Sequence, residues 1–173
     1  MTLASNHTYL EPLVGRLWKT WPQNQSLTLV FHGHSVPAGY FATPRVQTFD
    51  AYPHLLHLAL GGRFPDAVVN AVVTAVGGEN AEGGAARFER EVLSHRPDLI
   101  TLDYSLNDRE LGFEKAKSAW KAMIEAALER QIPVLLLTPI PEVACFLEPG
   151  GAADTTLRQH AQQVRDLAAE YRE

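Results

Sequence analysis

The sequence predicts an α/β domain in which helices cover both faces of a mostly parallel β-sheet. Four short apolar runs alternate with segments whose apolar residues recur at helical spacing, and neighbouring parallel strands need such helices as crossover connections. The chain has 173 residues, of which 46% are hydrophobic and 20% charged, enough for a core of its own. Because no repeat, low-complexity tract or linker interrupts the alternation, we expect one domain over residues 1–173.

The first part of the chain predicts a helix, a strand and a second helix. Apolar residues at helical spacing indicate a helix over residues 10–18. The continuous apolar run at 27–32 is typical of a strand buried on both faces. Residues 48–60 also carry apolar side chains on one helical side, and Pro53 lies early enough in this segment to be tolerated.

The middle of the chain predicts a second strand and a short helix. Residues 67–73 are apolar except for one position and read as a strand. A glycine-rich turn at 77–80 precedes a helix that runs through Arg87 to Leu93. This helix ends before Pro97, because a proline disfavours the helical conformation in the residue that precedes it.

The last part of the chain predicts two more strands and two amphipathic helices. Residues 98–103 form the third strand, and residues 113–128 carry a single apolar helical stripe. Residues 134–137 form the fourth strand, and residues 155–171 form the last helix. The order of strands and helices is that of a parallel sheet built from crossover units.

Charge and composition exclude several classes of function. The 15 Lys and Arg residues are outnumbered by 20 Asp and Glu residues and form no basic stripe, so we expect no nucleic-acid partner. No segment approaches the roughly 18 apolar residues of a membrane span, and the first residues lack a signal-peptide pattern. We therefore expect a soluble, cytoplasmic protein.

A single cysteine, Cys145, excludes an internal disulfide and a thiolate zinc site, and the sequence indicates no metal and no cofactor.

Polar and glycine residues follow three of the predicted strands, at 33–35, 77–80 and 105–108. The carboxyl ends of parallel strands meet at one edge of a sheet, so we expect these segments to converge there. Acyl transfer needs a nucleophilic oxygen, a base and donors for the oxyanion. Ser35 offers the oxygen, and the backbone N–H groups of Ser35 and Gly78 with the Asn107 carboxamide offer the donors.

These segments resemble the blocks that define the SGNH or GDSL family of serine esterases and lipases. Residues 33–36 resemble its Gly-Asp-Ser-Leu block, Gly78 lies where its second-block glycine lies, and Asn107 matches the asparagine of its Gly-x-Asn-Asp block. The resemblance implies a flavodoxin-like three-layer α/β/α fold and a cofactor-independent ester hydrolase. It also implies that Ser35 is the nucleophile and that Gly78 and Asn107 form the oxyanion hole.

The chain departs from the family pattern in three places. His34 stands where the family commonly has Asp, and Leu106 where it commonly has Gly. The fourth block, Asp-x-x-His, which supplies the general base, does not occur, and His160 follows Asp154 by six positions rather than three. The resemblance therefore implies a C-terminally incomplete domain, in which the final strand, the last helix and the base histidine lie beyond residue 173.

Structural interpretations remain open for each site residue. Ser35 is also suited to cap the helix after the first strand, Gly78 to occupy a turn that needs a positive φ, and Asn107 to close an Asx turn.

The other chemistry-bearing residues point to no second site. His32 with His34, and His54 with His57, have spacings that suggest metal pairs, but neither pair has an obvious third ligand. The sequence does not show a histidine partner that would activate the Cys145 thiol, so Cys145 ranks below Ser35 as a nucleophile.

Two functions follow from the sequence. The first is hydrolysis of an acyl or acetyl ester, on a small molecule or a carbohydrate, through an acyl-enzyme. The second is a catalytically silent domain that binds a ligand or a partner chain, because a sheet without its last strand exposes an edge. The partner in that case is a second copy of the chain or a complementing C-terminal fragment. Acyl length and leaving group depend on loops whose course the sequence does not predict.

Overall fold

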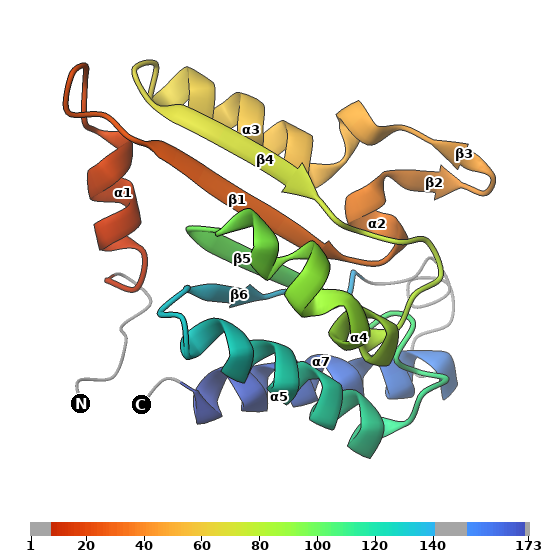
Figure 1. The fold of residues 1–173 in the computed structure, drawn as a ribbon. Coiled ribbons are helices and arrows are strands. Elements are labelled where there is room, and N and C mark those ends of the chain that lie inside the picture. Colours follow the sequence, from red (N-terminus) through yellow and green to blue (C-terminus); the bar gives the residue numbers. More distant parts are fainter. Residues whose placement is uncertain (1–7, 141–151, 172–173) are drawn as a thin grey trace.

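The computed structural model describes residues 8–140 and 152–171, and these form three layers with a parallel sheet between two layers of helices (Figure 1). The fold class predicted from the sequence is therefore confirmed. The strand order is β4-β1-β5-β6, and every pairing is parallel. The four strands are β1 (Ser26–Gly33), β4 (Val68–Val73), β5 (Leu99–Asp103) and β6 (Val134–Leu136).

Strand β1 is the centre of the sheet, as its continuous apolar sequence predicted. It pairs with β4 on one side, where Val30 lies opposite Val72, and with β5 on the other, where Gly33 lies opposite Asp103. From β1 the chain goes first to β4 on one side of the sheet and afterwards to β5 and β6 on the other side. In open α/β sheets, ligands bind beyond the carboxyl ends of the strands at such a switch point.

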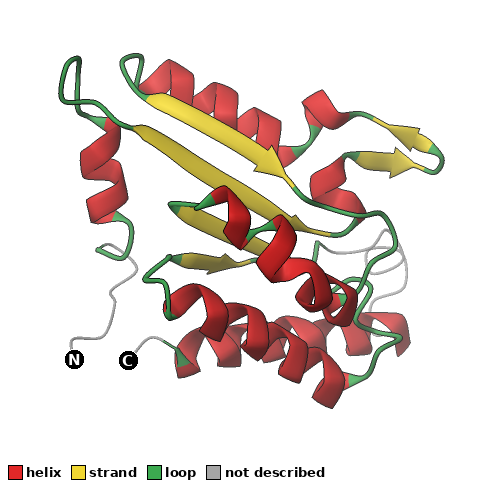
Figure 2. Cartoon of the chain, viewed as in Figure 1, coloured by secondary structure: helices red, strands yellow, loops and turns green. Residues whose placement is uncertain are grey.

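Helices cover both faces of the sheet (Figure 2), and alternate residues of β1 belong to different core clusters. Leu29 and Phe31 pack with residues of α3 (Tyr52–Arg63) and with residues at and before the start of α1 (Glu11–Leu17). Val30 belongs to the larger core cluster on the other side. That cluster is completed by α4 (Ala81–Glu91), α5 (Phe113–Leu128) and α7 (Ala152–Glu170).

The predicted helix over residues 48–60 is divided in two. A 3-10 helix, η1 (Thr48–Asp50), ends at Ala51, whose backbone is extended with ψ 147°, and α3 begins at the next residue. Pro53 then lies in the first turn of α3, where its missing N–H leaves no hydrogen bond unmade. The last helix begins at Ala152, three residues before the predicted start.

Four short elements were not predicted, because none is long enough to show a periodicity. They lie mainly between β1 and α3, where a short helix and a hairpin follow the end of β1 (Figure 1). They are α2 (Ser35–Ala38), β2 (Tyr40–Ala42), β3 (Arg45–Val46) and the 3-10 helix η2 (Leu93–His95).

No helix in the described ranges has the length and apolar character that a membrane crossing requires.

Candidate active site

Ser35 is the first residue of α2, directly beyond the carboxyl end of β1. It is partly buried, and within the described ranges its backbone N–H has no hydrogen-bond acceptor. The helix has only four residues, because Gly39 follows in the left-handed conformation with φ 95° and closes it with bonds to the carbonyls of Ser35 and Val36. The turn therefore presents both the Ser35 hydroxyl and the Ser35 N–H at the edge of the sheet.

Gly33 allows β1 and β5 to approach closely beneath Ser35. A Cβ atom at this position would lie 2.6 Å from the Asp103 carbonyl oxygen and 2.9 Å from Cγ of Pro37. The His34 N–H donates to the same carbonyl at 3.1 Å, so the contact between the strands continues one residue past the end of β1. Only glycine fits this position without a shift of the backbone.

His34 occupies the space between Ser35 and Asp103. Its imidazole is buried, with Nδ1 3.3 Å from Ser35 Oγ and Nε2 3.3 Å from Asp103 Oδ1. The Val36 N–H also donates to Nδ1, at 3.2 Å, so His34 is the N-cap of α2. The sequence interpretation that Ser35 caps this helix is therefore incorrect.

Gly78 lies in the turn between β4 and α4. Its φ is 79°, a value that L-residues rarely adopt, and a Cβ atom there would meet no other atom within 4 Å. Its N–H makes no hydrogen bond with any described residue. The positive φ thus agrees with the turn interpretation and leaves a backbone donor available.

Asn107 reaches from the segment after β5 to the turn after β4. Its Nδ2 donates to the carbonyl oxygen of Glu79 at 2.9 Å, across 28 residues of sequence. This long-range bond is not an Asx turn, so that interpretation of Asn107 is incorrect. One N–H of the carboxamide is used in this bond, and the second remains for a ligand.

Three hydrogen bonds connect the segments that follow β1, β4 and β5. The Val76 N–H donates to the Gly33 carbonyl at 3.0 Å, the His34 N–H donates to the Asp103 carbonyl, and Asn107 donates to the Glu79 carbonyl. The three strand ends that the sequence singled out are therefore held together at one edge of the sheet.

The Glu79 side chain holds the turn after β4 through hydrogen bonds with Arg87 and Tyr104. Arg87 donates from Nε to Glu79 Oε1 at 2.8 Å and from Nη2 to Oε2 at 2.5 Å, and Tyr104 Oη donates to Oε2 at 3.0 Å. Burial raises the pKa of Tyr104, so its hydroxyl stays neutral and remains a donor. This charge-assisted network fixes the residue whose carbonyl orients Asn107.

Asp108 is a structural residue, although it neighbours Asn107. It is fully buried, and its carboxylate accepts from the Ala81 N–H at 2.8 Å and from Trp120 Nε1 at 2.7 Å. Burial raises the pKa of this carboxyl, and the two hydrogen bonds oppose that effect. Asp108 thereby joins the segment after β5 to both α4 and α5.

A polar depression of about 690 Å³ adjoins these residues. It is open to solvent, and Ser35 is not among the residues that line it. The lining residues are Gly78, Asn80, Leu106, Asn107, Arg109, Glu110 and Thr156.

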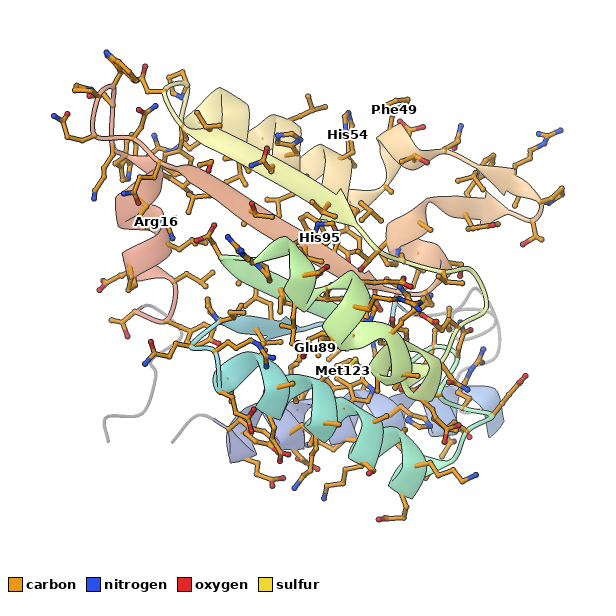
Figure 3. All side chains as sticks on the ribbon, in the orientation of Figure 1. Arg16, Phe49, His54, Glu89, His95 and Met123 are labelled. Atoms are coloured by element: carbon orange, nitrogen blue, oxygen red, sulfur yellow. The ribbon has the colours of Figure 1, made fainter. Side chains whose placement is uncertain are left out.

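Four other histidines have structural partners. His32 Nε2 lies 3.1 Å from the Gly84 carbonyl, and His57 Nε2 lies 2.9 Å from the Val69 carbonyl. His54 and Phe49 lie side by side, with their rings in an edge arrangement (Figure 3). His160 stacks on Phe113, with ring centroids 4.3 Å apart.

No group of three metal-ligating side chains occurs within residues 8–140 and 152–171. Cys145 lies outside the described residues.

The sequence did not identify Asp103 as part of the site. Asp103 ends a predicted strand, but its contact with His34 spans 69 positions and depends on the register between β1 and β5. The only feature of the sequence that could have pointed to Asp103 is that it is an acidic residue at the carboxyl end of the third predicted strand.

Comparison with known proteins agrees with this fold. The sequence profile described as the GDSL-like lipase/acylhydrolase family matches residues 31–172. No match is found among curated protein sequences.

Two solved structures are similar in fold. One is a two-domain esterase active on acetylated mannans, with a TM-score of 0.68 and 21% identity over 89% of this chain and 38% of that one. The other is an acetylxylan esterase from Geobacillus stearothermophilus, with a TM-score of 0.69 and 17% identity over 83% of this chain and 72% of that one. The chain thus spans less than half of the two-domain esterase.

Proposed function

Because the chain belongs to the GDSL-like lipase/acylhydrolase family, we propose that it is a carboxylic-ester hydrolase in which Ser35 is the nucleophile. The observation that carries this proposal is the convergence of the segments after β1, β4 and β5, held by three hydrogen bonds. The proposal is supported because the Ser35 hydroxyl follows β1 while Gly78 and Asn107 follow β4 and β5, and the backbone N–H groups of Ser35 and Gly78 make no hydrogen bond with any described residue.

In the proposed reaction, Ser35 Oγ attacks the ester carbonyl and forms an acyl-enzyme, which water then hydrolyses. The negative charge that develops on the carbonyl oxygen is stabilised by the N–H groups of Ser35 and Gly78 and by the carboxamide of Asn107. Donors of this kind are effective because they are fixed before the reaction begins. The Arg87–Glu79–Tyr104 network supports this fixation by holding the turn that Asn107 contacts.

We expect the substrate to be an acetyl or other short acyl ester of a carbohydrate or a small alcohol. The two similar structures are described as esterases of acetylated mannans and of acetylxylan. The depression beside Gly78 and Asn107 is lined mainly by polar side chains, which suits a leaving group that carries hydroxyls.

Hydrolysis of p-nitrophenyl acetate by the full chain tests the proposal. Ser35→Ala should abolish turnover, because it removes the proposed nucleophilic oxygen. Ser94→Ala is the matched control, since the Ser94 hydroxyl is exposed and donates to the Arg90 carbonyl at the opposite end of β5. Equal activity in Ser35→Ala and the wild-type chain would rule the assignment out.

A second candidate is the silent domain that binds a partner through a sheet edge. It is favoured by β6, which among the described residues pairs only with β5. Association of the chain in sedimentation analysis, together with an unreactive Ser35, would support this candidate over the esterase.

A further inference from the structure

Helix α3 exposes an apolar face that no described residue covers. Its 12 residues include a single charged side chain, Arg63 at the end, whereas surface helices usually carry charged residues on their outer face. Leu55 and Leu58 are neighbours on the helix surface, because they are three positions apart, and they are 49% and 61% exposed. Phe49, in η1 just before the helix, is 74% exposed. A group of large exposed apolar side chains of this kind marks an interaction surface.

Exposed apolar residues also lie past both ends of α3. The β2–β3 hairpin precedes η1 at the N-terminal end of the helix and exposes Phe41 and Val46 (Figure 1). At the C-terminal end, the half-exposed Trp18 packs on Phe64, with ring centroids 4.7 Å apart. We call this set the α3 surface, and its exposed members are Trp18, Phe41, Val46, Phe49, Leu55 and Leu58.

The α3 surface has the size of a protein interface. A buried aromatic side chain contributes about 150–250 Å², and three of the six residues are aromatic and more than half exposed. Together the six expose several hundred Å², which is the scale of the roughly 800 Å² that each partner contributes to a stable complex.

The two ends of the α3 surface carry opposite charges. Asp50 lies just before the helix and Arg63 ends it, and both are exposed. Neither forms an ion pair within the described ranges, and the Arg63 guanidinium lies over the Trp18 ring, 4.5 Å from its centroid. A matching partner therefore has a basic group near Asp50, an acidic group near Arg63 and apolar side chains between them. A second α3 helix, turned antiparallel to the first, has this arrangement.

We propose that the α3 surface binds a second copy of the chain, so that two antiparallel α3 helices form the centre of a two-fold symmetric dimer. In the register that brings Asp50 near Arg63 of the second copy, Leu55 lies opposite Leu58 of the second copy. Symmetry repeats both contacts on the other side of the axis. The dipoles of the two helices then also run in opposite directions, which is the favourable arrangement. The dimer goes beyond the proposed function and does not depend on Ser35.

The shape of the α3 surface also suits a second copy. Gly61 and Gly62 leave room at the C-terminal end of the helix, where a Cβ atom at either position would meet no atom within 4 Å. Phe49 protrudes at the other end, next to His54 (Figure 3). The two-fold rotation brings the Phe49 ring of each copy toward the two glycines of the other. It also brings the hairpin of each copy toward Trp18 of the other.

The neighbouring edge of the sheet, at β4, is less suited to contact with another chain. The Thr74 N–H donates to the Phe31 carbonyl of β1, and residues of a strand alternate in direction, so the Val69 carbonyl points away from β1. His57 of α3 already bonds to this carbonyl at 2.9 Å. An added strand would have to displace the His57 ring, so the helix face is the contact that we infer.

Sedimentation velocity of the full chain over a range of concentrations tests the dimer. The wild-type chain should shift from the mass of one chain to twice that mass as its concentration rises. Leu58→Asp should raise the dissociation constant by at least about 100-fold, because it places a charge at the centre of the interface in both copies. Leu58 is exposed in the single chain, so the variant should fold, and circular dichroism and thermal unfolding check this.

Leu128→Asp is the matched control. Leu128 is a partly exposed leucine at the end of α5, in the other helical layer, and the variant carries the same added charge. It should dimerise like the wild type. Ser35→Ala should also dimerise like the wild type, so failure of the proposed ester hydrolysis leaves the dimer intact, and failure of the dimer leaves the hydrolysis intact.

A charge exchange tests the antiparallel register. Asp50→Arg and Arg63→Asp should each raise the dissociation constant by about tenfold, because each places like charges together at both ends of the interface. The variant that carries both substitutions should restore the wild-type dissociation constant, since the opposite charges meet again.

Four results would overturn the proposal. They are a wild-type chain that stays monomeric at every concentration, a dimer that Leu58→Asp leaves unchanged, and a double charge variant no tighter than the single ones. The fourth is a monomeric chain that floats with phosphatidylcholine vesicles, which would identify lipid as the occupant of the α3 surface.

Discussion

Asn107 shows how one side chain can serve both structure and chemistry. Its carboxamide donates one N–H to the Glu79 carbonyl, and the other N–H is the proposed oxyanion donor. Asn107→Ala removes both interactions. We expect kcat for ester hydrolysis to fall by about 10²–10³-fold, because the proposed oxyanion donor is lost. The free energy of unfolding should fall by only about 1 kcal/mol, the usual contribution of one hydrogen bond.

Asn24→Ala is the control for this variant. Asn24 is also partly buried, and its Nδ2 donates to the Asp66 carbonyl at 2.9 Å, far from the site. Asn24→Ala should lower the free energy of unfolding by about as much as Asn107→Ala, and it should leave ester hydrolysis unchanged. A loss of activity in Asn107→Ala no greater than in Asn24→Ala would exclude Asn107 from the oxyanion hole.

His34 shows where residue-level reasoning from the sequence stops. The sequence contains His34 next to Ser35, but it does not show that the ring is buried between Ser35 and Asp103. This placement depends on the pairing of β1 with β5, which no local pattern specifies. The position of Ser35, in contrast, follows from its place directly after an apolar run, and it was predicted.

At the scale of elements, the site depends on the close contact between β1 and β5. Gly33→Ala would place a methyl group against the Asp103 backbone, which cannot yield as a flexible side chain can. We expect the free energy of unfolding to fall by about 1–3 kcal/mol, as in other overpacked cores. Ester hydrolysis should fall as well, because Ser35 and His34 follow directly. Urea denaturation and p-nitrophenyl acetate hydrolysis measure the two effects.

Gly61→Ala is the control for the strand contact. Gly61 lies on exposed α3, and a Cβ atom there would meet nothing within 4 Å. Alanine is favoured over glycine inside a helix, so this variant should gain up to about 1 kcal/mol. If Gly33→Ala proves as stable and active as Gly61→Ala, the close approach of the strands is not required.

The length of an element decided whether the sequence predicted it. The helix over residues 113–128 was predicted with its observed bounds, because four turns of apolar spacing define it. The helix α2 has four residues and the strands β2 and β3 have three and two, so they show no period to detect. These short elements surround Ser35, and for that reason the site was predicted less completely than the fold.

At the scale of the whole molecule, acid should destabilise the fold through His32. Burial, together with the positive charge of Arg87, lowers the pKa of this imidazole from 6.5 to about 4. Between these values the unfolded chain binds a proton that the folded chain does not, so the free energy of unfolding falls as the pH falls. The expected loss is about 2 kcal/mol between pH 7 and pH 5.

Urea denaturation at the two pH values checks this expectation. His32→Gln should reduce the difference between them by about that amount, whereas His95→Gln, at an exposed position, should not. An unchanged pH dependence in His32→Gln would show that His32 is not the group responsible.

The free edge of the sheet is partly covered in the described structure. The Val134 N–H, at the start of β6, donates to Tyr9 Oη at 2.9 Å, so a residue from before α1 satisfies a backbone group of this strand. The expectation that the edge pairs with another chain stays a prediction. The parallel pairing of the strands was predicted, because helices of sufficient length separate all four apolar runs.

The central claim, that Ser35 forms an acyl-enzyme, is tested most directly by trapping the intermediate. The chain is mixed with p-nitrophenyl acetate, quenched with acid during turnover, digested and analysed by mass spectrometry. We predict one acetyl group on the peptide that carries Ser35, at Oγ, and none in the Ser35→Ala variant. Turnover with the acetyl group on a different residue, or with no covalent intermediate at any quench time, would contradict this account.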